Sequence, residues 1–141
     1  MTLLEDSGLV PRASFYSDIV PDGRPARGVW RDGLLTAARS ADIVFLDPDN
    51  GLVVSSRPIG QKGSSKYVSW EEVEALWRAG CSVLVYQHFR RETRIVFISR
   101  IAKELSLRTG ARVIEAFTTS HVLFMFMAQE PHVNLLLGLC S

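Results

Sequence analysis

Apolar residues gather along the chain in two patterns: short continuous runs, and longer segments in which they recur every three or four positions. Continuous runs are typical of strands covered on both faces of a parallel sheet, whereas the spaced pattern is typical of amphipathic helices. The patterns predict helices over residues 30–41, 69–80 and 90–110, and strands over residues 43–46, 82–89, 111–117 and 121–128.

The helix over 69–80 has the clearest boundaries. Ser69 and Glu72 stand three residues apart at its start, which is the spacing of a capping box, and Gly80 follows its last turn. By contrast, residues 1–28 have little periodicity and are interrupted by glycines and prolines. We therefore expect a loop-rich N-terminal lead-in over 1–28 and one α/β domain over 29–141.

The order of the elements predicts how the strands are arranged. Strands that alternate with helices imply right-handed crossovers, so we expect an α/β three-layer sandwich with a mostly parallel sheet and helices on both faces. The last two strands are separated by only residues 118–120, which permits an antiparallel hairpin and excludes a parallel crossover. The sheet should therefore end in a C-terminal antiparallel hairpin.

Polar side chains follow two of these strands at the carboxyl edge, where ligands bind in such sheets. Asp47, Asp49 and Asn50 come after the first strand, and His88 ends the second. We consider these four residues candidate catalytic groups, because carboxylates accept hydrogen bonds, an amide both donates and accepts, and imidazole can transfer a proton near neutral pH. A turn for Asp-Pro-Asp-Asn-Gly and a purely structural histidine are the alternatives.

Basic and polar residues nearby suggest a surface that contacts phosphate. The segment GQKGSSKY, residues 60–67, is small, polar and basic, as expected for a mobile loop that binds a ligand, although a solvated surface loop fits equally well. It lacks the spacing of a nucleotide phosphate-binding loop. The candidate substrate-binding residues are Lys62, Lys66, Tyr67, Tyr86, Gln87 and Arg90.

Composition narrows the class of protein without indicating a reaction. A chain of 141 residues with 47% hydrophobic residues suits one globular domain, and a net charge of +1 means that nucleic acid could bind only through a local basic patch. Cys81 and Cys140 have neither disulfide nor metal spacing. With no signal peptide and no apolar run of about 18 residues, we expect a cytoplasmic protein with no membrane partner.

Three segments, DIVFLDPDNGL, SWEEVEALW and VLVYQHF, resemble the second half of a class I S-adenosylmethionine-dependent methyltransferase domain, over roughly residues 29–130. The closing hairpin also resembles that fold, whose final strand is antiparallel. In methyltransferases that act on adenine amino groups, the fourth strand ends in an Asp-Pro-Pro-Tyr type motif. The resemblance places residues 47–50 at that motif.

The chain departs from that pattern in two ways. Asn50 stands where those enzymes carry an aromatic residue that stacks on a flipped base. The first three strands and their Gly-rich turn have no counterpart, so the resemblance implies S-adenosylmethionine as a cofactor only if a missing N-terminal half supplies its site. More closely, FLDPDNGL, KGSSKYV and LVYQHF resemble a bacterial family without an established activity, whose longer members carry a further N-terminal region.

Three functions follow from these patterns. The first is a methyltransferase-like domain, whether active, incomplete or degenerate, that acts on or binds nucleic acid. The second is a metal-dependent phosphodiesterase in which Asp47 and Asp49 hold magnesium through oxygen ligands. The third is a binding module without catalysis. An open sheet edge would also favour a homodimer.

Overall fold

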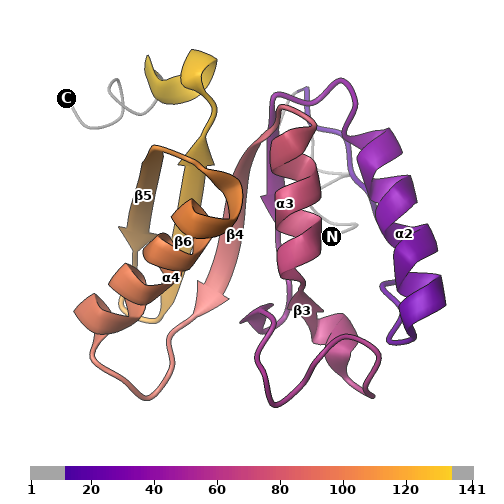
Figure 1. The fold of residues 1–141 in the computed structure, drawn as a ribbon, viewed down its shortest axis with the longest axis horizontal. Helices are drawn as coiled ribbons and strands as arrows, with labels where there is room; N and C mark the ends of the chain where they lie inside the picture. The colour runs from indigo at the N-terminus through magenta and orange to yellow at the C-terminus, as the bar shows by residue number, and fades with distance from the viewer. Residues whose placement is uncertain (1–11, 135–141) are drawn as a thin grey trace.

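The computed structural model describes residues 12–134, which form an α/β fold with the helices and strands shown in Figure 1. In chain order these are α2 (Arg24–Ala37), β1 (Ile43–Leu46), β2 (Gly51–Leu52), the 3-10 turn η1 (Ser64–Lys66), β3 (Tyr67–Val68), α3 (Trp70–Arg78), β4 (Ser82–His88), α4 (Arg94–Thr109), β5 (Val113–Thr118), β6 (Val122–Ala128) and the 3-10 turn η2 (Glu130–His132). Every helix and strand predicted from the sequence is present, but α2 spans Arg24–Ala37 instead of residues 30–41. The short strands β2 and β3 were not expected.

The four-stranded sheet is mixed: β1, β4 and β5 point in one direction and β6 points in the other, as a mostly parallel sheet with one antiparallel strand requires. Its strand order is β1-β4-β6-β5, in which β1 and β4 are parallel while β6 is antiparallel to both of its neighbours. The hairpin of β5 and β6 confirms the predicted antiparallel ending. Strand β6 inserts between β4 and β5, so the one antiparallel strand makes two antiparallel pairs. Strands β2 and β3 form a separate parallel pair.

One face of the four-stranded sheet carries the core. Side chains of β4 and β6 on this face pack against α3 and α4, which lie in front of the sheet in Figure 1, and α2 packs against α3. The fully buried residues at this layer include Val73, Leu76, Val83, Val85, Phe97, Leu105, Leu123, Met125 and Met127. Burial of this apolar surface is the main favourable contribution to folding.

The opposite face of the sheet, which we call the outer face, is partly open. Ile43 is 42% exposed and Phe45 is 49% exposed, so the expectation that β1 is covered on both faces is wrong. The continuous apolar run reflects a row of aromatic contacts instead, since the Phe45 and Phe124 rings lie 6.2 Å apart. Within residues 12–134 the outer face carries no helical layer, and only a small cluster around Phe126 covers one end of it.

One helix begins inside the segment that was expected to be a loop-rich lead-in. Helix α2 begins at Arg24, and Pro25 lies in its first turn. A proline is tolerated there because the first backbone N–H groups of a helix have no partner within the helix. The inner side of α2 nevertheless follows the predicted spacing, with Leu34 buried and Trp30 packed against the core.

Helix α3 has the predicted ends. The Ser69 hydroxyl accepts a hydrogen bond from the Glu72 N–H at 3.1 Å, and the Glu72 carboxylate accepts one from the Ser69 N–H at 2.9 Å. Gly80 lies just past the last turn with φ of +93°, a conformation that favours glycine. No helix in the described part of the chain is long and apolar enough to cross a membrane.

Candidate functional site

The two polar corners predicted from the sequence lie against each other at the carboxyl ends of β1 and β4. His88 Nε2 lies 2.7 Å from the backbone carbonyl oxygen of Asp49. Since β1 and β4 are parallel neighbours, their ends meet at the same edge of the sheet. Asp47 and Asp49 are exposed residues of the turn that follows β1 and leads to β2.

Gln87 joins β2 to β4. Its side chain is buried, its Oε1 accepts a hydrogen bond from the Leu52 N–H at 2.8 Å, and its Nε2 donates one to the His88 carbonyl at 3.0 Å. Gly51 fits this arrangement because it adopts φ of +102°, and a Cβ there would lie 2.5 Å from the Gln87 amide. Gln87 was predicted to bind substrate, but its amide is already engaged by the protein, so it positions the site.

A cavity of about 370 Å³, which we call the Asn50 pocket, opens between the turn and the end of β4. It brings together four of the residues predicted from the sequence, Asn50, Tyr67, His88 and Arg90, and is completed by Val54 and Ser56. These side chains come from separate segments of the chain, which meet because β2 pairs with β3 and β2 is held on β4.

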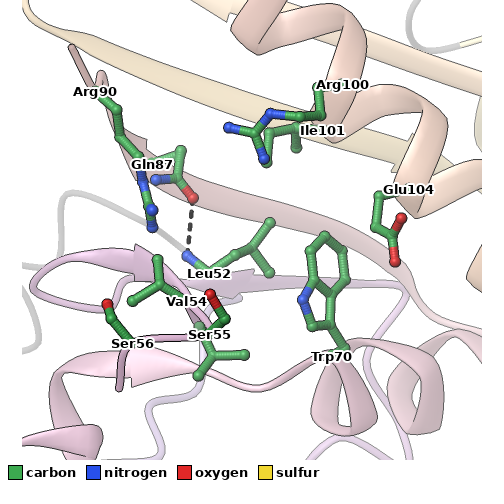
Figure 2. A pocket seen from close by; sticks show the side chains of 11 residues that line it. Leu52, Val54, Ser55, Ser56, Trp70, Gln87, Arg90, Arg100, Ile101 and Glu104 are labelled. Carbon is green, nitrogen blue, oxygen red and sulfur yellow. Dashed lines mark hydrogen bonds between the residues drawn. The ribbon is translucent and has the colours of Figure 1, made fainter. Parts of the chain in front are cut away.

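A second cavity of about 340 Å³, which we call the Trp70 pocket, adjoins the first. Figure 2 shows Arg90 and Gln87 on one side of it, Trp70 on another, and Arg100 and Glu104 reaching in from α4. The Glu104 carboxylate accepts a hydrogen bond from Arg108 Nε at 2.6 Å. Sequence reasoning missed Trp70, Arg100 and Glu104, because residues on two different helices carry no common spacing.

Hydrogen bonds hold the loop of residues 60–66, for which a mobile ligand-binding loop and a solvated surface loop were equally expected. The Asp22 carboxylate accepts hydrogen bonds from the Gly63 N–H at 2.9 Å and the Ser65 N–H at 2.7 Å. These bonds stabilise the ionised carboxylate and lower the pKa of Asp22 to about 2. Lys62 and Lys66 on this loop are exposed and line neither pocket.

A buried ion pair supports the wall of the Asn50 pocket from behind. Arg27 Nε lies 2.5 Å from Glu72 Oε1, and its NH2 lies 2.9 Å from Glu72 Oε2. The same guanidinium donates hydrogen bonds to the carbonyls of Ser64 at 3.3 Å and Tyr67 at 2.6 Å. This role was not predicted, because Arg27 lies in the segment expected to be a loop-rich lead-in.

Tyr86 lies outside both pockets. It points to the outer face, where its ring meets the His88 ring edge-on at 5.1 Å and the Phe124 ring at 5.6 Å. Asp47, Asp49, Lys62 and Lys66 also line neither pocket. The structure therefore gathers half of the predicted residues around the two pockets: Asn50, Tyr67, Gln87, His88 and Arg90.

No cluster of three or more His, Cys, Asp or Glu side chains within residues 12–134 could hold a metal ion. The magnesium-dependent phosphodiesterase that uses Asp47 and Asp49 stays a prediction. Comparison of the chain with protein-family models, curated proteins and solved structures finds no match.

Proposed function

We propose that this chain is a methyltransferase-like α/β domain that binds nucleic acid at the carboxyl ends of β1 and β4. The antiparallel last strand β6 supports the methyltransferase-like part of the proposal, because the fold it resembles also ends in one. The Asp-Pro-Asp-Asn turn follows β1, in the place that the resemblance gives to the substrate-facing motif.

The observation that carries the nucleic-acid part is the lining of the Asn50 pocket. It combines the Arg90 guanidinium, the His88 imidazole and the Tyr67 ring, and no carboxylate lines it. Within residues 12–134, no hydrogen bond or ion pair engages the Arg90 side chain, so its donors are free for a ligand. A guanidinium recognises phosphate with paired hydrogen bonds, while aromatic rings stack on bases.

S-adenosylmethionine does not fit these residues. The cofactor carries a sulfonium and an ammonium cation beside one carboxylate, and the Asn50 pocket offers an arginine for that carboxylate but no anion for either cation. In the Trp70 pocket the one carboxylate, Glu104, shares the lining with Arg90 and Arg100 and is hydrogen-bonded to Arg108. We therefore propose that these residues bind nucleic acid and do not themselves supply methyl transfer.

Fluorescence anisotropy with a labelled oligonucleotide at several salt concentrations tests the proposal. Each lost phosphate contact lowers the slope of log affinity against log salt by about 0.7–0.9, so Arg90→Gln should weaken binding and flatten this slope by about that amount. Arg91→Gln is the matched control, because Arg91 is the exposed neighbour that lines neither pocket. Equal effects of the two substitutions, or no binding by the unmodified chain, would refute the proposal.

We also propose that two copies of the chain pair through the edge of the sheet. Among the described strands β1 has only β4 as a neighbour, and its four residues Ile43–Leu46 include no charge or proline that would protect the edge. Light scattering coupled to size-exclusion chromatography should give twice the mass of one chain. Val44→Pro should return the monomer mass, and a monomeric unmodified chain would exclude the dimer.

A further inference from the structure

The two pockets form one continuous binding surface. Val54, Ser56 and Arg90 line both of them, so they share a wall rather than opening at separate places. Figure 2 shows Arg90 on the far side of the Trp70 pocket from Trp70, with Val54 and Ser56 near its guanidinium end. A ligand that extends from one pocket to the other must therefore pass Arg90.

The size of the pockets indicates what such a ligand can be. Their volumes are about 340 Å³ and 370 Å³, and cavities of this order enclose a small molecule or a single nucleotide unit. Proteins read a DNA duplex by inserting a helix or ribbon into its major groove, about 12 Å wide, which calls for a protruding element. Concave pockets suit bases that are unstacked and splayed out of a single strand.

Each pocket also contains an aromatic side chain. Trp70 lines one and Tyr67 the other. The Arg108 guanidinium lies 4.8 Å from the Trp70 ring centroid, and the backbone of Tyr67 is held because its carbonyl accepts a hydrogen bond from the buried Arg27. Bases stack on such rings without strong sequence preference, because every base presents a flat π face.

We infer that the ligand is single-stranded nucleic acid, with two consecutive nucleotides in the Trp70 and Asn50 pockets and the phosphate between them at Arg90. This inference rests on the proposed function. The nucleotide in the Asn50 pocket lies beside the Asn50 amide and the His88 ring, and the other lies beside Ser55 and Ser56. The surface thus recognises a flexible strand by stacking and by one central phosphate contact.

Amide and indole NMR spectra of the full ¹⁵N-labelled chain test the inference. Titration with a short oligothymidine should shift the indole N–H signal of Trp70 and leave those of Trp30 and Trp77, which line neither pocket, unchanged. A blunt-ended duplex of the same length should bind about tenfold more weakly, because its bases cannot stack on the rings.

Substitution separates stacking from a structural effect. Trp70→Leu should lower the affinity for oligothymidine about tenfold, while Trp70→Phe, which keeps an aromatic ring, should restore most of it. If duplex and single strand bind equally and the Trp70 signal stays unchanged, the inference fails and the proposed function stands. If neither binds, both fail.

Discussion

The buried ion pair between Arg27 and Glu72 gives a quantitative test of how the site is supported. The side chains of the two residues are only 5% and 2% exposed, and two short contacts join them. Removing one partner leaves the other charge buried without compensation. We therefore expect Arg27→Met and Glu72→Gln each to lower the free energy of unfolding by about 3–5 kcal/mol.

The effects of the two substitutions on the free energy of unfolding should be neither equal nor additive. Arg27→Met also removes the donors to the carbonyls of Ser64 and Tyr67, whereas Glu72→Gln keeps an oxygen that can accept from the Ser69 N–H. Arg27→Met should therefore lower the free energy of unfolding more than Glu72→Gln does. In the double variant neither buried charge remains. Its free energy of unfolding should therefore fall by about 1–3 kcal/mol less than the sum of the decreases in the two single variants.

Urea denaturation followed by circular dichroism measures these values. The matched control is Glu92→Gln, which breaks the ion pair with Arg100. That pair has the same 2.5 Å separation, but its side chains are 30% and 53% exposed, so its loss should cost less than about 1 kcal/mol. If the buried and exposed pairs cost the same, or the double variant is additive, the reasoning from burial is wrong.

Three further outcomes follow from the geometry. Gly51→Ala should cost at least about 2 kcal/mol more than the control Gly80→Ala, measured by urea denaturation, because a Cβ at Gly51 meets the Gln87 amide and one at Gly80 meets nothing within 4 Å. Asp22 has a pKa depressed from 3.8 to about 2, so its contribution to stability is present above pH 4 and is lost as the pH falls towards 2. In Asp22→Asn the melting temperature should fall less between pH 4 and pH 2 than it does in the unmodified chain. An equal fall in the two proteins would contradict this assignment. Phe45→Ser should reduce binding of an apolar dye, since Phe45 is half exposed on the outer face.

Local signals in the sequence predicted the elements well. The capping box of Ser69 and Glu72 and the glycines after two helices are short-range patterns, and the structure confirms α3 and the end of α4 at Gly110. The meeting of the two polar corners was also predictable, because parallel neighbours bring their carboxyl ends to one edge. The contact between His88 and the Asp49 carbonyl follows from that rule.

Long-range partners could not be read from the sequence. A continuous apolar run looks the same whether helices or other aromatic side chains cover it, so the open outer face around Phe45 was missed. Nothing in the sequence around Arg27 distinguishes it from an exposed charged residue, because its partner Glu72 lies 45 positions away along the chain. Likewise Trp70 and Arg100 share a pocket only through the packing of α3 against α4.

The short parallel pair of β2 and β3 has a consequence for how this protein can diversify. The Asn50 N–H bonds to the Lys66 carbonyl at 2.9 Å and the Val53 N–H to the Val68 carbonyl at 2.8 Å, so the intervening segment leaves and returns at adjacent points. Doubling the length of such an excursion costs only about 0.6 kcal/mol of closure entropy. Insertions and deletions between residues 54 and 62 can therefore change the rim of the pockets beside Ser55 and Ser56 without changing the pairing of β2 with β3.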